Sequence, residues 1–205
     1  MSNEVKTKEK VDMDPKYIIK LTVTLFVTCV IVAGLLGLVN SATCGPIAEI
    51  NKAKTEAAMK AVVADPENST FSEALEITGD MTAAASSAGA TVTEAYEVQV
   101  GGAPAGYALK IVSSGSQGNI EMMVGVDGEG AVTGVSIVDN SETSGIGSRV
   151  MSNENGVLDQ FIGKSAADGT LAVGTNVDAI SGATVSSRGV TTGVNAALAV
   201  AGVMG

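Results

Sequence analysis

The sequence predicts an α+β protein in which one N-terminal transmembrane helix precedes a small antiparallel-sheet domain with flanking helices. Three observations predict this arrangement. A long uncharged stretch lies near the N-terminus, four strand-like runs follow in the middle of the chain, and a helical pattern of small residues closes it. At 205 residues, the chain has room for one ordinary domain beside the anchor.

The uncharged stretch runs from Leu21 to Ile47 and reads LTVTLFVTCVIVAGLLGLVNSATCGPI. About 20 apolar helical residues cross the roughly 30 Å hydrocarbon core of a bilayer, so we predict a transmembrane helix over residues 17–43. A secretory signal peptide is the alternative, but its apolar core is shorter and ends at a small-residue cleavage site. We therefore expect a retained, single-pass anchor in the cell (inner) membrane.

The charges beside this stretch predict its orientation. Five lysines lie in the tail of residues 1–16 or at the start of the helix: Lys6, Lys8, Lys10, Lys16 and Lys20. Nearby acids almost cancel them, but acids count little in the positive-inside rule, so the N-terminus should be cytoplasmic and the main domain extracytoplasmic. The rest of the chain carries seven basic and eighteen acidic residues, a net charge of minus eleven, so nucleic acid is not an expected partner.

Residues 44–92 predict a helical stalk followed by a linker. From Glu49 to Val63 the apolar residues recur at helical spacing, and Asp65–Pro66 breaks the pattern. From Thr78 to Thr91 the chain is rich in Gly, Ala, Ser and Thr, with too little side-chain bulk to pack well. We interpret that part as a linker or a loose edge.

Residues 93–205 predict the sheet domain. Gly-rich turns separate its strand-like runs, as in an antiparallel meander; the runs are 95–100, 107–112, 119–126 and 131–138. Ile120, Met122 and Val124 share one face, which predicts a sheet covered on one side. A short helix is expected from Asn153 to Ile162 and a longer one from Ser186 to Val203; the inward residues expected in the longer one are Val190, Val194 and Leu198.

The composition excludes several kinds of site. The chain has no histidine, and its two cysteines, Cys29 and Cys44, would lie roughly 22 Å apart along a helix. No disulfide and no zinc, haem or other metal site is therefore expected. Neither a Walker-type phosphate loop nor a dinucleotide GxGxxG pattern is present.

One motif that can carry chemistry precedes the last predicted helix. Residues 178–187 read DAISGATVSS and place small residues and several hydroxyls where that helix begins. Unpaired backbone N–H groups and the positive end of the helix dipole gather there and would hold a phosphate well. From composition alone, N-capping of the helix explains the hydroxyls equally well.

The segment from Asp178 to Thr184 resembles the flavinylation motif of the FMN-binding domain family, which includes the G subunit of the Rnf complex and the C subunit of the sodium-pumping NADH:quinone reductase. In that family the final Thr is joined through its hydroxyl to the FMN phosphate. The resemblance implies covalent FMN, in a phosphothreonine linkage, on Thr184, with Ser181, Gly182 and Ala183 beside it.

The resemblance also implies a partner that attaches the cofactor. Asp178 would serve the modification or fix the loop and would not carry electrons. Because Thr184 has no neighbouring histidine to activate it, self-modification is not expected. A separate flavin transferase that uses FAD as the FMN donor is implied.

A second signature reads Glu-Thr-Ser-Gly-Ile-Gly and is similar to the family's Glu-Thr-Pro-Gly-Leu-Gly. Gly145 and Gly147 would let the backbone approach a flat ring, and Ile146 would lie against it. Glu142 and Thr143 would offer polar atoms to the edge of the ring. The two conservative departures, Ser144 for Pro and Ile146 for Leu, bear on the stiffness of the loop.

Three other residues are candidates for the same site. Lys164 could neutralise the FMN phosphate, although a lone lysine after a helix is commonly solvated, and Arg188 is a rival for this role. Tyr107 could pack on the ring or belong to the sheet core.

The resemblance covers most of the chain and implies an electron-transfer subunit of a membrane-bound Rnf-type ferredoxin:NAD oxidoreductase coupled to sodium or proton translocation. Such a subunit has no catalytic residue or complete active site of its own, and its partners are the other subunits of the complex. Two alternatives stay open. One is a related flavin-dependent chain, either a quinone-linked sodium pump or extracellular electron transfer, and the other is a non-enzymatic membrane-anchored binding module.

Overall fold

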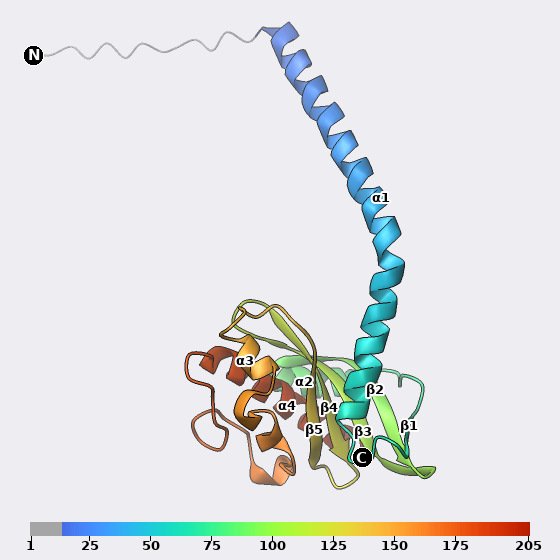
Figure 1. Ribbon diagram of the computed structural model, residues 1–205, viewed down its shortest axis with the longest axis vertical. Helices are drawn as coiled ribbons and strands as arrows, with labels where there is room; N and C mark the ends of the chain where they lie inside the picture. The colour runs from blue at the N-terminus through green and yellow to red at the C-terminus, as the bar shows by residue number, and fades with distance from the viewer. Residues whose placement is uncertain (1–13) are drawn as a thin grey trace, which may run out of the picture. The chain divides into compact units, whose positions relative to one another are not determined.

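The computed structural model describes residues 14–205 (Figure 1), so the predicted tail of residues 1–16 lies almost entirely outside the described residues. The chain divides into two compact units, Met1–Ile50 and Asn51–Gly205. Helix α1, Pro15–Ala61, begins in the first unit and ends in the second.

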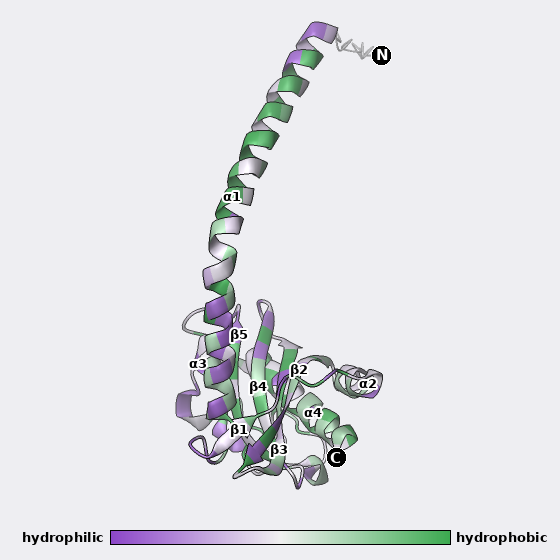
Figure 2. Ribbon diagram, turned by 90° about the vertical axis from the view of Figure 1, so that its right-hand side faces the viewer, coloured by the Kyte–Doolittle hydropathy of each residue, from purple (hydrophilic) through white to green (hydrophobic). Residues whose placement is uncertain are grey.

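Within the described residues, α1 is the one helix that is long and apolar enough to cross a membrane, with a mean hydropathy of 2.5 over its most apolar 18 residues. Figure 2 shows this apolar character along the helix. The hydroxyls of Thr22, Thr24 and Thr28 each donate to the carbonyl four residues earlier, at 2.7–2.9 Å. Polar groups satisfied inside the helix are what a hydrocarbon environment requires.

The second unit is built on a five-stranded antiparallel sheet in the order β1-β2-β3-β4-β5. The strands are β1 Ser69–Phe71, β2 Ala90–Val100, β3 Ala103–Ser114, β4 Asn119–Asp127 and β5 Val132–Asn140. The predicted meander is confirmed, since its four strands pair in sequence order. The strands β2 and β3 are longer than predicted, and β1 was not predicted.

Three helices accompany the sheet: α2 Gly79–Ser87, α3 Ser148–Met151 and α4 Thr184–Met204. The predicted last helix is confirmed as α4, which begins two residues earlier than expected. The helix predicted from Asn153 to Ile162 is wrong, because this segment forms two 3-10 turns, Glu154–Gly156 and Asp159–Phe161. Asn153 and Asn155 have φ of 55° and 58°, which an α-helix does not allow.

One face of the sheet packs against α2 and α4. The predicted inward residues Ile120, Met122 and Val124 are buried in this core, together with Val190, Val194 and Leu198 of α4. Small residues let α4 approach closely, since a Cβ added at Gly193 would lie 2.5 Å from the Met122 sulfur. The core therefore fixes α4 to the centre of the sheet.

The other face of the sheet is covered by the end of α1. Ala58, Met59 and Val62 form a second buried cluster there, which includes Met123 of β4. The prediction of a sheet covered on one side is therefore wrong, because adjacent β4 residues, Met122 and Met123, point to opposite faces and both are fully buried.

The helix predicted from Glu49 to Val63 is confirmed as the end of α1, which stops at Ala61, whereas the rest of the predicted stalk and linker differs from the structure. Its residues from Asn51 onward belong to the same compact unit as the sheet. The small-residue stretch after Thr78 forms α2, whose first turn is capped by the Thr78 hydroxyl and which buries Met81 and Ala85. The boundary between the units thus follows Ile50, whereas the sequence placed the start of the sheet domain at residue 93. Small side chains here allow close packing against β2 and α4.

Gly125→Ala is expected to destabilise the second unit by about 1–3 kcal/mol, the usual cost of overpacking a core. A Cβ at Gly125 would overlap the Val62 carbonyl oxygen and the Thr133 hydroxyl, which are hydrogen-bonded to each other at 2.5 Å. Thermal unfolding of the full chain in detergent measures the effect. Gly128→Ala is the matched control, because the nearest atom to its added Cβ would be 4.0 Å away. Equal unfolding midpoints for the two variants would contradict the described packing.

Candidate functional site

The motif DAISGAT ends where α4 begins. Thr184 is the first residue of this 21-residue helix, and the N-cap residue is Ala183, which makes no side-chain capping hydrogen bond. The motif hydroxyls therefore do not cap α4 in the way that composition alone allowed. The start of α4 keeps backbone N–H groups that no side chain within residues 14–205 satisfies, which is the arrangement that binds anionic groups.

The motif hydroxyls fall into two groups. Ser186 and Ser187 are buried: the Ser186 hydroxyl donates to Glu142 Oε2 at 2.6 Å, and the Ser187 hydroxyl donates to the Ala183 carbonyl at 3.1 Å. Ser181 and Thr184 are exposed, and neither hydroxyl makes a hydrogen bond within residues 14–205. These two hydroxyls are therefore free to react or to contact a ligand.

A tight turn presents Thr184 at the surface. The Ala183 N–H donates to the Ile180 carbonyl at 2.9 Å, and Gly182 has a φ of 82°, a conformation that favours glycine. Ile180 and Ala183 are buried in the main core. Their burial anchors the turn to the core, and Ser181, Gly182 and Thr184 are exposed on the surface.

Glu142 joins the second predicted signature to the first. Its Oε1 accepts hydrogen bonds from the backbone N–H groups of Ser116 at 2.6 Å and Gln117 at 3.3 Å, while Oε2 accepts from the Ser186 hydroxyl. The carboxylate thus ties together the β3–β4 turn, the loop after β5 and the first turn of α4. The sequence proposed that it faces the edge of a ring, whereas the structure uses both of its oxygens inside the protein.

The other residues of this loop take different places. Gly147 is buried, and a Cβ there would overlap the Glu142 carboxylate, so this glycine makes room for the contacts of Glu142. Gly145 is exposed with a φ of 79°. Thr143 and Ile146 are also exposed, with 51% of Ile146 accessible. Of the residues predicted to contact the ring from this loop, Thr143, Gly145 and Ile146 therefore remain accessible to a ligand.

Asp178, at the start of the motif, is held by a residue to which sequence reasoning gave no role in the site. Gln160 accepts from the Asp178 N–H at 2.7 Å and donates to the Asp178 carbonyl at 3.0 Å. No sequence pattern links these two residues, which lie 18 positions apart. The Asp178 side chain itself is exposed.

A cavity of about 450 Å³ adjoins this part of the motif, and its lining includes Asp178, Ser181, Gln160, Arg149 and Glu154. Arg149 was also missed by sequence reasoning. It forms a two-point ion pair with Glu154, at 2.8 Å through Nε and 2.6 Å through Nη2. Hydrogen bonding from Arg149 holds the pKa of Glu154 below its ordinary value, so this carboxylate stays charged near neutral pH.

Two predicted site residues are not brought to Thr184. The Tyr107 hydroxyl donates to the Met204 carbonyl at 3.2 Å, at the far end of α4, which is about 30 Å long. The Lys164 carbonyl accepts from the Val132 N–H at 2.8 Å, at the start of β5, whereas the Glu142 loop follows the end of that strand. Of the predicted cations, Arg188 lies close to the motif, in the first turns of α4, and it is exposed.

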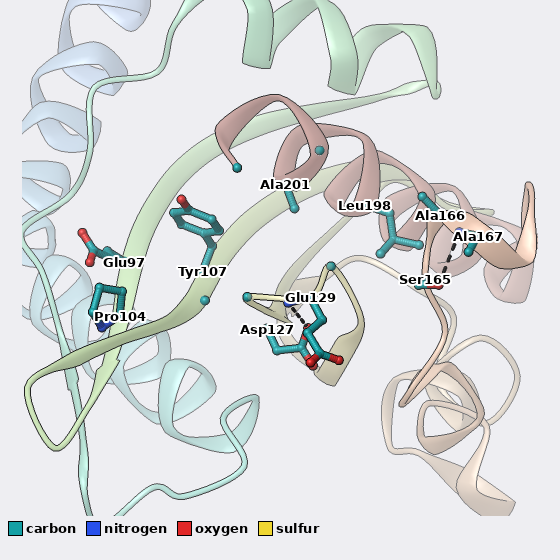
Figure 3. A pocket seen from close by; sticks show the side chains of 15 residues that line it. Glu97, Pro104, Tyr107, Asp127, Glu129, Ser165, Ala166, Ala167, Leu198 and Ala201 are labelled. Atoms are coloured by element: carbon teal, nitrogen blue, oxygen red, sulfur yellow. Dashed lines mark hydrogen bonds between the residues drawn. The ribbon is translucent and has the colours of Figure 1, made fainter.

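Tyr107 instead lines a separate cavity of about 430 Å³ (Figure 3). Leu198 and Ala201 of α4 form one wall, and Asp127, the last residue of β4, also lines the cavity. This cavity contains none of the motif residues, so it is distinct from the surface around Thr184.

Comparison with known proteins identifies the class to which this fold and site belong. Residues 115–199, which include the Glu142 loop and the whole motif, match the family model described as an FMN-binding domain. The chain is 36% identical to the G subunit of the Na⁺-translocating ferredoxin:NAD⁺ oxidoreductase complex of Acetobacterium woodii, over 96% of this chain and 97% of the relative. It is 31% identical to the G subunit of the ion-translocating oxidoreductase complex of Methanosarcina acetivorans, over 90% and 95% of the two chains.

The chain belongs to the family of Rnf complex G subunits, as the similarity over nearly the whole length of both relatives shows. The named relatives are subunits of ion-translocating oxidoreductase complexes. Among solved structures, the chain is similar to the C subunit of the Na⁺-translocating NADH-quinone reductase from Parabacteroides distasonis, with 19% identity and a TM-score of 0.49 over 74% of this chain and 90% of that chain.

Proposed function

We propose that this chain is the FMN-carrying electron-transfer subunit of a membrane-bound, ion-translocating ferredoxin:NAD oxidoreductase complex, with FMN joined through a phosphoester to Thr184. One observation carries the site assignment. The Thr184 hydroxyl is exposed and makes no hydrogen bond within residues 14–205, at a helix start without a side-chain cap, inside the segment that matches an FMN-binding domain. The names of the similar G subunits support the function of the complex.

The residues around Thr184 fit the group. The N–H groups at the start of α4 favour a phosphate, and the exposed guanidinium of Arg188 adds a positive charge one turn further on. Ser181 and Gly182 leave polar and open surface beside the threonine. The exposed Ile146, in the loop tied to α4 through Glu142, offers an apolar contact for a flat ring. Bound FMN supplies reversible redox chemistry that the side chains of this protein lack.

Attachment of the cofactor needs a second protein. The Thr184 oxygen would form a bond to the FMN-side phosphorus of FAD, while the bond between that phosphorus and the AMP oxygen breaks and AMP leaves. The hydroxyl proton must pass to a base, and the chain has no histidine to take it. We therefore place the base on a flavin transferase, which completes its work before the chain enters electron transfer.

The anchor and the charges support a site that faces the outer side of the membrane. The apolar part of α1 would span the bilayer, with the lysine-rich tail on the cytoplasmic side and Thr184 on the extracytoplasmic side. Free flavin is dilute outside the cell, so a cofactor lost from the site would not be replaced. A covalent bond prevents that loss. The partners in this proposal are the other subunits of the complex.

Deletion of this chain is expected to remove ferredoxin-dependent NAD reduction from membranes that contain the complex. The wild-type chain should restore the activity, and Thr184→Ala should insert normally and fail to restore it. Thr175→Ala, which alters another exposed threonine, is the matched control and should restore activity. Loss of quinone reduction instead of NAD reduction would support a quinone-linked pump, and a colourless wild-type protein made with the transferase would support a binding module.

A further inference from the structure

Gln160 holds the backbone on both sides of the Asp178 α-carbon. The Asp178 N–H donates to Gln160 Oε1 at 2.7 Å, and Gln160 Nε2 donates to the Asp178 carbonyl at 3.0 Å. The same nitrogen also donates to the Val157 carbonyl at 2.7 Å. The side-chain amide thereby acts as a short neighbouring strand would, with a donor and an acceptor matched to one residue.

The segment that carries Gln160 is itself anchored in the core. Phe161, the next residue, is 1% exposed, and Leu158 and Val157 are also buried in the main core. The two 3-10 turns on this segment, which is separate from the motif in the sequence, bring the Gln160 amide to Asp178. A side chain on a well-packed segment positions its partner more closely than one on a free loop.

The consequence is a fixed relation between the backbone at Asp178 and the backbone at Thr184. Gln160 sets the backbone at Asp178, and buried Ile180 and Ala183 set the turn that leads to Thr184. The Asp178 carboxylate is exposed and has no hydrogen bond or ion pair within residues 14–205. It is thus held in place by its backbone alone and is free to meet another protein.

We propose that Gln160 is a positioning residue for covalent flavin attachment, which holds Asp178 so that a cationic or hydrogen-bond-donating surface of the FMN-transferring protein can engage its carboxylate beside Thr184. This inference rests on the proposed function, because it presupposes that Thr184 receives FMN. Gln160 acts through Asp178 and does not touch the flavin.

The test measures the initial rate of FMN incorporation into the full chain in detergent, with purified transferase and FAD. Gln160→Leu removes both hydrogen bonds to Asp178 at nearly the same volume, and the incorporation rate is expected to fall about tenfold or more, because small misplacements near a reacting group are costly. Gln160→Glu keeps an acceptor for the Asp178 N–H and should fall between wild type and Gln160→Leu. Gln99→Leu, on β2, is the matched control and should incorporate FMN at the wild-type rate.

A double-mutant cycle separates positioning from general damage. Asp178→Asn removes the carboxylate through which Gln160 acts, so Gln160→Leu should have no further effect in that background. Multiplied losses in the double variant, or a wild-type rate for Gln160→Leu, would overturn the inference while leaving the proposed function intact. Failure of the proposed function has a different signature, since Thr184→Ala would then acquire as much covalent flavin as wild type. Unfolding midpoints of all variants identify any loss of incorporation rate that comes from misfolding. If Gln160→Leu is misfolded, the incorporation rate of Gln160→Glu decides whether Gln160 positions Asp178.

Discussion

Thr184→Ala is expected to yield a protein that inserts and folds normally and carries no covalent flavin. The side chain of Thr184 is exposed and makes no hydrogen bond within the described residues, so its removal costs little stability. In-gel flavin fluorescence of the denatured protein, produced in membranes with the transferase, measures the effect. The expected loss of covalent flavin is complete, because Thr184 is the one hydroxyl residue of the motif that stands at the first position of α4.

The matched control for this variant is Thr175→Ala, which should keep the fluorescence of wild type. Ser181→Ala tests the neighbouring exposed hydroxyl and should also keep a covalent band. Fluorescence that persists in denatured Thr184→Ala would show that the flavin is attached elsewhere, and Ser181 would then be the first position to examine.

Glu142→Ala is expected to produce the second large effect, a loss of about 2 kcal/mol in unfolding free energy together with a marked loss of flavin attachment. The substitution removes a charged acceptor from the Ser116 N–H and the Ser186 hydroxyl. Ser116 is exposed, so its N–H can bind water instead, and the loss is expected to be near that of one hydrogen bond to a charged group, about 1.5–3 kcal/mol. The first turn of α4 then loses its tie to the β3–β4 turn. Thermal unfolding and in-gel fluorescence of the full chain measure the two consequences.

Glu142→Gln is expected to lose less unfolding free energy and less flavin attachment than Glu142→Ala. The amide oxygen can accept from the Ser116 N–H, and the amide nitrogen can donate to the Ser186 hydroxyl. Glu129→Ala, in the exposed turn after β4, is the control for loss of a surface carboxylate. If Glu142→Ala and Glu129→Ala gave the same unfolding midpoint and the same fluorescence, the role of Glu142 as a structural tie would be wrong.

Much of the fold follows from local patterns in the sequence. Alternation in β4 and helical spacing in α4 predict both elements, because the residues of one face recur at the period of a strand or of a helix. Where local pattern was weak, prediction failed. The stretch after Thr78 has small side chains that carry little periodic signal, and only its packing against α4 and β2 makes it a helix. The burial of Met123 depends on Ala58 and Val62, which approach from more than 60 residues earlier.

In the site, too, local motifs could be predicted from the sequence and long-range contacts could not. The motif and the Glu142 loop are continuous in the sequence, so resemblance to a family found both. The contacts that hold them, from Glu142 to Ser186 and from Gln160 to Asp178, cross 44 and 18 positions and leave no local pattern. Tyr107 shows that residue type alone can mislead. An aromatic side chain suits contact with a flavin ring, but this one lies at the far end of α4 from Thr184.

The most direct test of covalent FMN on Thr184 is the mass of the peptide that contains residues 178–187, taken from the wild-type chain in its native membrane. The proposal predicts a gain equal to one FMN less one water, with fragment ions that place it on Thr184. An unmodified peptide from membranes in which the transferase is present and active would contradict it.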